Sequence, residues 1–88
     1  MAGKVGGDLA SMLALKRTLE SNSNRAAELK SSVKSQLGNT VWEGPAAQRF
    51  RESWDKDYEP ALAKLMAALQ EAAAEVQRRH DALERASQ

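Results

Sequence analysis

Few residues in this 88-residue chain could do chemistry, and its single histidine is the first of them. His80 and Glu84 are four positions apart, so on a helix they share one face and could form half of a metal site. Two ligands close to the end of the chain make a weak site, because a stable zinc site normally needs three or four. We therefore predict ordinary solvated polar side chains here, with no metal site and no cofactor.

Three aromatic residues, Phe50, Trp54 and Tyr58, also follow one another at four-residue spacing. Exposed rings can stack on nucleic-acid bases, but such sites also need a basic groove. Here the basic residues alternate with acids, as in the segment 49–59. We predict that these rings pack against another helix or against a protein partner.

The charge balance and the composition exclude several classes of function. Thirteen lysines and arginines stand against 12 aspartates and glutamates, which is not the excess typical of proteins that bind nucleic acid or anionic membranes. The absence of cysteine excludes disulfides and thiolate metal sites. There is no glycine-rich phosphate loop and no nucleophile elbow, so we predict that the chain is not an enzyme. No apolar run is long enough for a signal peptide or a membrane span, and we expect a soluble protein without stable membrane insertion.

Apolar residues recur at helical spacing over two long segments. Residues 1–7 are rich in glycine and are predicted as a flexible tail, and 8–88 as one helical domain. The first helix is predicted over about 8–37, beginning at Asp8, with Gly38 and Asn39 as left-handed residues that end it. The predicted seam of this helix, at steps of three and four, contains Met12, Leu15, Leu19, Asn22, Ala26, Leu29 and Val33.

The second helix is predicted over about 46–86, after a turn at 38–45. It opens at Gly44 and Pro45, because a proline at the first helical position loses no hydrogen bond. Pro60 is the only residue that interrupts the helical pattern, and we expect it to bend the helix without ending it.

The second helix has a wider apolar face than the first. The residues of this face that we predict to contact a partner are Phe50, Trp54, Tyr58, Leu62, Leu65, Met66, Leu69 and Val76. Two helices form a thin object with no second layer, so the face needs further helices to cover it. We predict an all-α fold in which an antiparallel two-helix hairpin dimerises into a four-helix bundle.

Trp42 lies between the two predicted helices, two residues before Gly44. One interpretation is a hydrophobic plug, in which the indole covers the open end of the hairpin. The other is that Trp42 and Gly44 form a recognition surface where the chain reverses. Composition favours the plug, and the two interpretations are compatible.

The motif around this turn carries a family resemblance. Trp42-Glu43-Gly44, followed by Ala46-Ala47 and Phe50, reads W-x-G-x-A-A-x-x-F at the midpoint of a cysteine-free helical hairpin. This resembles the WXG family of small proteins, similar to the early secretory antigenic target, which type VII (ESX or Ess) secretion systems export. The resemblance covers nearly the whole chain.

The resemblance implies a function in secretion by protein–protein binding. It implies a homodimer, or a heterodimer with a sister WXG protein, that transiently contacts the membrane ATPase of the export system. Synthesis would be cytoplasmic and the final location extracellular, without a cleaved signal peptide. Trp42 and Gly44 would form the turn part of the secretion motif.

The chain departs from the family pattern at its C-terminal end. The family signal reads Y-x-x-x-[DE], whereas this chain has His80 and Glu84 at the matching spacing. The pair is therefore a degenerate signal candidate. The alternatives are a signal-lacking half of a heterodimer, a homodimer with a degenerate signal, or a chaperone-like partner of a larger toxin. A different class also remains open, namely a cytoplasmic coiled-coil oligomerisation or adaptor module.

Overall fold

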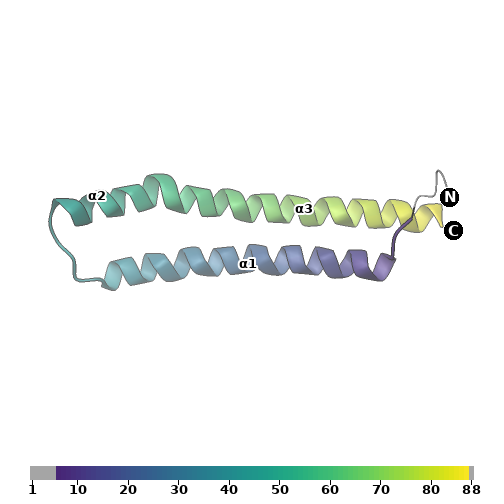
Figure 1. Cartoon of the computed structure of the whole chain (residues 1–88), viewed down its shortest axis with the longest axis horizontal. Coiled ribbons are helices and arrows are strands. Elements are labelled where there is room, and N and C mark those ends of the chain that lie inside the picture. Colours follow the sequence, from purple (N-terminus) through teal and green to yellow (C-terminus); the bar gives the residue numbers. More distant parts are fainter. Residues whose placement is uncertain (1–5, 88) are drawn as a thin grey trace.

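The computed structural model describes residues 6–87 and forms a helical hairpin with two long antiparallel arms (Figure 1). The first arm is α1 (Leu9–Asn39). The second arm is continuous and consists of α2 (Pro45–Ser53), the π-helical turn η1 (Trp54–Tyr58) and α3 (Glu59–Ala86). No strand occurs within residues 6–87. The predicted all-helical hairpin is confirmed. Residues 1–5 of the predicted tail lie outside the described residues, and Gly6 and Gly7 are exposed and non-helical.

The helix starts follow the predicted chemistry. The carboxylate of Asp8 accepts a hydrogen bond from the amide of Ala10 at 3.1 Å, which caps α1. Gly44 is the N-cap residue of α2, and Pro45 occupies its first turn.

The predicted end of the first helix is wrong. Gly38 and Asn39 are helical, and Gly44 is the only residue with positive φ among residues 6–87. The helix ends because Thr40 is extended and bonds back to it. The Thr40 hydroxyl donates to the Gln36 carbonyl at 2.6 Å, and the Thr40 amide donates to the Leu37 carbonyl at 3.3 Å. These bonds satisfy terminal carbonyls without a left-handed residue.

Pro60 is accommodated by one wide helical turn rather than by a bend alone. The amide of Glu59 donates to the carbonyl of Trp54, five residues earlier, and η1 lies directly before the proline. A proline ring clashes with the carbonyl four residues before it, and a π turn relieves such crowding by adding one residue to the turn. The ribbon bulges outward at this junction (Figure 1). The added residue rotates the side chains of α2 about the helix axis relative to those of α3.

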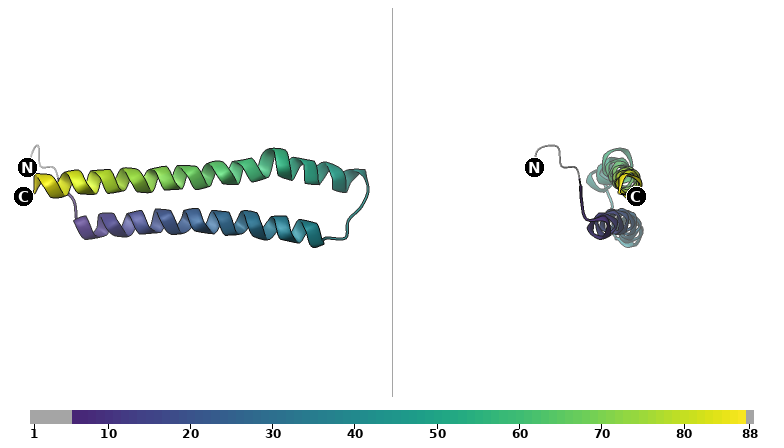
Figure 2. Two further views of the ribbon diagram at one scale, coloured as in Figure 1. Left: turned by 180° about the vertical axis from the view of Figure 1, so that it is seen from behind. Right: turned by 90° about the vertical axis from the view of Figure 1, so that its right-hand side faces the viewer.

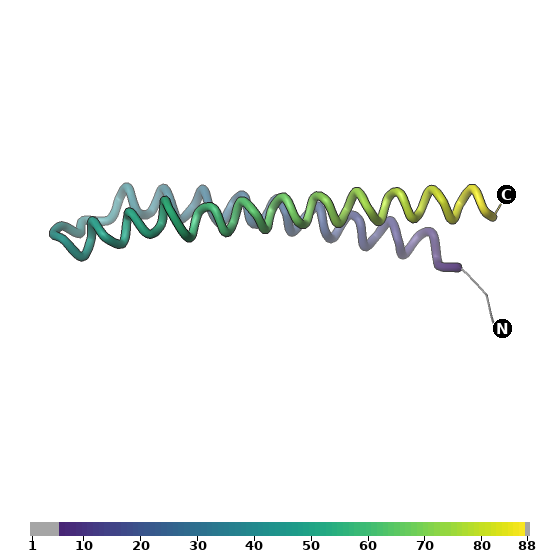
Figure 3. The backbone as a smooth tube through the Cα atoms, turned by 90° about the horizontal axis from the view of Figure 1, so that it is seen from above, coloured from purple at the N-terminus to yellow at the C-terminus, as the bar shows by residue number. Residues whose placement is uncertain are grey.

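Small residues form the closest contact between the two arms. The most buried residues of the described chain are Ser23, Ala26, Ala47, Trp54, Ala73 and His80. The arms cross at a shallow angle near mid-length (Figure 3), where small side chains allow the backbones to approach. The predicted seam is therefore only partly right, because Leu15, Leu29 and Val33 are exposed and Asn22 lies at the surface.

The hairpin is a single layer of two helices (Figure 2). Its extents are 65 × 20 × 18 Å, and its radius of gyration is 19.8 Å. A compact domain of this length would have a radius of gyration of about 12 Å. Within residues 6–87, none of the helices is long and apolar enough to span a membrane.

Candidate functional site

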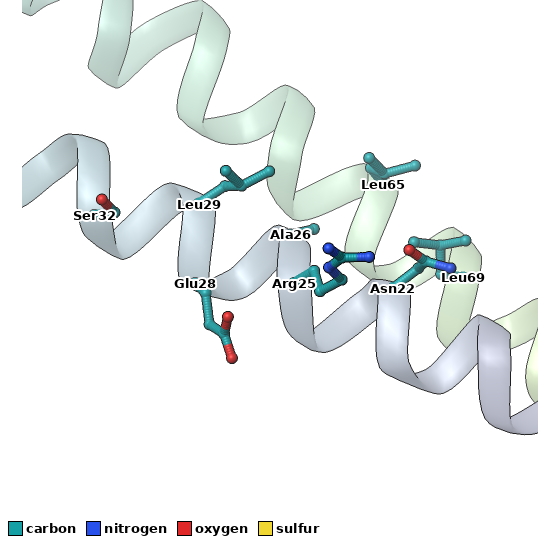
Figure 4. Close-up of a pocket in the computed structure, with 8 residues that line it drawn as sticks. All are labelled: Asn22, Arg25, Ala26, Glu28, Leu29, Ser32, Leu65 and Leu69. Carbon is teal, nitrogen blue, oxygen red and sulfur yellow. The ribbon is translucent and has the colours of Figure 1, made fainter.

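A groove runs between α1 and α3 near the middle of the hairpin (Figure 4). Its volume is about 590 Å³. The apolar residues that line it are Ala26, Leu29, Leu65 and Leu69, and the polar ones are Asn22, Arg25, Glu28 and Ser32. Leu29 is 58% exposed and Leu65 is 48% exposed, although both side chains lie at the groove. A groove of this composition suits a helix with an apolar face.

The groove belongs to a longer apolar surface, which we call the open face. It consists of the exposed residues Leu15, Leu29 and Val33 of α1 with Phe50, Tyr58 and Leu65 of the second arm. On α1, Leu15, Leu29 and Val33 lie within about 40° of one another at about 100° per residue. On the second arm, the rings of Phe50 and Tyr58 contact each other, and Leu65 follows Tyr58 by seven residues, which returns to within about 20° of the same direction. Leu29 and Leu65 meet at the groove and join the two halves of the face.

The residues predicted to contact a partner have three different locations. Phe50, Tyr58 and Leu65 are exposed on the open face. Leu62, Met66, Leu69 and Val76 are half-buried between the arms and the surface. Trp54 is only 8% exposed and packs inside the hairpin, so its prediction as a partner contact is wrong for this conformation. The wide turn η1 begins at Trp54 and ends at Tyr58, so it changes the spacing between these two side chains but not that between Phe50 and Trp54.

Two opposite charges lie on the α1 side of the groove. Arg25 and Glu28 form no ion pair and no side-chain hydrogen bond among residues 6–87. Arg25 extends over the groove beside Asn22, whereas the Glu28 carboxylate points away from α3 (Figure 4). Asn22 donates its amide to the Thr18 carbonyl at 2.9 Å, within its own helix.

The four aromatic side chains form one continuous chain of ring contacts at the turn end of the hairpin. Ring centroids are 5.7 Å apart for Trp42 and Phe50, and 6.3 Å for Phe50 and Tyr58. Tyr58 in turn lies 6.4 Å from Trp54. Such tilted pairs are favourable for aromatic rings. This series of ring contacts therefore connects the exposed turn to the buried indole of Trp54.

Trp42 lies at the turn and covers Phe50, but it remains 41% exposed. The covering that it provides is partial, and part of the residue is accessible to a partner. Trp54 is the tryptophan that fills the space between the arms near the turn. Its indole Nε1 has no hydrogen-bond partner among the described residues.

Arg51 holds the turn in place, a role that the sequence pattern did not indicate. Its guanidinium donates to the Trp42 carbonyl at 2.9 Å and to the Thr40 carbonyl at 3.2 Å. The planar fork of an arginine can bind two carbonyls at once, which a lysine cannot. The backbone on both sides of Val41 is thereby tied to α2.

Gly44 has a conformation that L-residues with a side chain rarely adopt. Its φ is 107° and its ψ is 177°, a region reached essentially only by glycine. A Cβ atom at this position would meet no atom within 4 Å. The requirement for glycine in Trp42-Glu43-Gly44 is therefore conformational and not a matter of space.

The predicted signal candidates His80 and Glu84 differ in exposure. Glu84 is exposed, whereas His80 is buried, so the prediction of a solvated histidine is wrong. His80 Nδ1 lies 3.0 Å from the Asp81 carboxylate, and the Gln77 amide donates to the same oxygen at 2.8 Å. These hydrogen bonds, first that of His80, lower the pKa of Asp81 below its ordinary value of 3.8.

Donor atoms of His80, Asp81 and Glu84 lie within 4.8 Å of one another. The Asp81 oxygen in this group is already hydrogen-bonded to two neighbours. One of the carboxylate oxygens of the cluster is thus already held by side chains of its own helix.

Comparisons with protein-family models, with curated proteins and with solved structures found no match.

Proposed function

We propose that the chain is half of a helical bundle, which binds a second helical hairpin and is exported in that form by a type VII secretion system. The function is binding rather than catalysis. The open face contacts the partner hairpin, and the turn at Trp42 and Gly44 is presented to the export machinery.

The large total exposed surface of the hairpin supports the pairing. The chain exposes 6689 Å², whereas a globular protein of 9.6 kDa would expose about 5,100 Å². The excess, roughly 1,600 Å², is larger than the approximately 800 Å² that each partner buries in a standard interface. A second hairpin on the open face would add the missing layer and complete a four-helix bundle.

The turn supports the secretion role. The W-x-G residues carry the resemblance to the WXG proteins, and each has a local reason for its type. Gly44 has a positive φ, and Trp42 contacts Phe50 and is partly exposed. Arg51 fixes the backbone on both sides of Val41, directly before the motif. A fixed turn with an accessible indole suits recognition by another protein, because binding then orders few additional groups. On this proposal the membrane ATPase of the export system is the transient partner.

The test measures the secreted fraction of a tagged form of the chain in a host with an active type VII system. Trp42→Ala is expected to reduce the secreted fraction at least fivefold while the melting temperature changes little. Val41→Ala is the matched control, because Val41 lies in the same turn and is 95% exposed. Its export is expected to equal that of the unaltered chain.

If Trp42→Ala is exported as well as the unaltered chain, Trp42 has no role in recognition. Its remaining role is then to cover Phe50 in part. If no type VII host exports the unaltered chain, yet it still pairs with a hairpin, the chain is an oligomerisation or adaptor module.

A further inference from the structure

Near the C-terminal end of α3, three side chains bring metal-ligating atoms together within little more than one helical turn. One ring nitrogen of His80 and one carboxylate oxygen each of Asp81 and Glu84 lie within 4.8 Å of one another. The spacing in the sequence offered only His80 and Glu84, and two ligands make a weak site. Asp81 supplies the third, and three protein ligands are the number that holds a zinc ion with one open coordination position.

His80 and Asp81 already have the geometry of a chelating pair. His80 is only 7% exposed and follows the buried Ala73 by seven residues, so its ring is held on the side of α3 that contacts α1. His80 Nδ1 lies 3.0 Å from the Asp81 oxygen Oδ1. Two tetrahedral ligands of a zinc ion lie about 3.3 Å apart. An ion that replaces the proton between these two atoms therefore needs little change in their separation.

The remaining atoms of the cluster are compatible with a bound ion. The Gln77 amide donates to the same Asp81 oxygen at 2.8 Å, and a carboxylate oxygen has lone pairs for both Gln77 and an ion. A hydrogen bond of this kind commonly holds a metal ligand in position. When Nδ1 binds the ion, the neutral imidazole carries its proton on Nε2, which forms no hydrogen bond among residues 6–87.

The Glu84 carboxylate is free to close the site. Glu84 is exposed, and its carboxylate forms no ion pair and no side-chain hydrogen bond within residues 6–87. Two carboxylates and a neutral imidazole together carry two negative charges, which balance the charge of a divalent cation. An imidazole combined with carboxylates suits zinc, nickel and copper, whereas magnesium and calcium prefer oxygen ligands alone.

We infer that His80, Asp81 and Glu84 form a site for one divalent transition-metal ion of the zinc type, with water in the open coordination position. The site lies at the end of the hairpin opposite the turn (Figure 1). All three ligands belong to α3, so a bound ion links the side chains of its last turns. Because the His80 ring is buried, the ion also fixes this end of α3 against α1. Metal binding here requires neither the pairing of hairpins nor export.

The test is a titration of the untagged chain with Zn²⁺, followed by isothermal titration calorimetry. One ion is expected to bind per chain. His80 is the only histidine, so the NMR signals of its imidazole should shift in the same titration. A Zn²⁺ concentration about 100-fold above the dissociation constant should raise the melting temperature by roughly 5–10 °C. Mg²⁺ at the same concentration should leave the melting temperature unchanged.

Glu84→Gln tests the site with little risk to the fold, because Glu84 is exposed. The loss of one charged ligand is expected to raise the dissociation constant for Zn²⁺ roughly tenfold or more. His80→Gln, which removes the only nitrogen ligand, should abolish the binding of one ion per chain. Glu75→Gln is the matched control, since it makes the same change on an exposed glutamate of α3 that pairs with Arg79. Its dissociation constant should stay within about twofold of the unaltered value.

Zn²⁺ binding that is equally tight in Glu84→Gln and His80→Gln, or imidazole signals that do not shift, would overturn the site. Mg²⁺ binding as tight as that of Zn²⁺ would also overturn it, because the imidazole would then play no part. Either result would leave the proposed pairing and export unaffected, since neither needs a bound ion.

Discussion

The hydroxyl of Ser23 donates a hydrogen bond to the main-chain carbonyl of Met66, 3.2 Å away on the opposite arm. Ser23 is only 2% exposed, and the contact joins the arms near the middle of the hairpin. A hydroxyl can reach a helical backbone carbonyl in this way only where both helices approach closely. The close approach depends on small side chains here, since Ala26 and Ala73 are also buried in the seam.

Ser23→Leu is expected to force the arms apart and to lower the free energy of unfolding by about 1–3 kcal/mol. Chemical denaturation at a fixed protein concentration measures the change, because association also affects apparent stability. Ser21→Leu is the control, since Ser21 is exposed on the same helix, and its effect should stay within about 0.5 kcal/mol. An equal loss from both variants would contradict the close contact at Ser23.

Gly44→Ala is expected to destabilise the hairpin by about 1–3 kcal/mol, because alanine is strained at a φ of 107°. Gly38 provides the opposite case, as it lies inside α1 with open space around it. Gly38→Ala is expected to raise stability by up to about 1 kcal/mol through helix propensity. Thermal unfolding of the two variants side by side would test the prediction, and a stabilised Gly44→Ala would show that the turn adopts another conformation.

The helix starts and the hairpin were predictable from local signals. Asp8, Pro45 and the three-to-four spacing of apolar residues each act within one or two turns of helix. The need for a turn between the arms is likewise predictable from local signals. These features needed no information on how the two arms face each other.

Which side of each arm contacts the other arm was not predictable from local signals. The three-to-four spacing places Leu15, Asn22 and Leu29 in the same predicted seam as Ala26. In the structure Ser23 and Ala26 occupy the seam, since close helix contact favours small residues over large ones. The exposed leucines are left for the open face.

The position of Trp54 depended on a backbone feature that spacing rules omit. An ideal helix places Phe50, Trp54 and Tyr58 on one side at about 100° per residue. The wide turn η1 changes the angle between Trp54 and Tyr58, and Trp54 is buried while Phe50 and Tyr58 are exposed. Pro60 was visible in the sequence, but a π turn as its consequence was not.

Arg51→Lys is expected to loosen the turn and to lower stability by about 1 kcal/mol, because lysine cannot bind the Thr40 and Trp42 carbonyls together. Hydrogen exchange of the amides of residues 40–44 should become faster. Arg49→Lys, an exposed arginine two residues away, should leave both quantities unchanged. Unchanged exchange in Arg51→Lys would mean that the guanidinium does not hold the turn.

Leu65→Asp is expected to disrupt association while leaving the hairpin folded. Leu65 is 48% exposed in the single chain, so a carboxylate there stays hydrated in the monomer but must lose water in the bundle. The dissociation constant from ultracentrifugation should rise about 100-fold or more, with helical circular dichroism retained. Val41→Asp, at the 95% exposed turn position, should dimerise normally. A dimer of unchanged affinity in Leu65→Asp would show that partners do not use the open face.

Asp81 should make the stability of the hairpin depend on pH in the acid range. Hydrogen bonds from His80 and Gln77 lower the pKa of Asp81 in the folded state below its ordinary value of 3.8. Because the folded-state pKa is the lower one, the stabilising contribution is complete above about pH 4 and is lost as the pH falls through the folded-state pKa. Asp81→Asn removes this contribution. The free energy of unfolding of the variant should therefore fall furthest below that of the unaltered chain near neutrality, and the difference should shrink between pH 4 and about pH 2. Thermal unfolding across this range measures the difference in stability between the two proteins. A deficit for Asp81→Asn that does not change with pH would show that the His80–Asp81 contact is absent in solution.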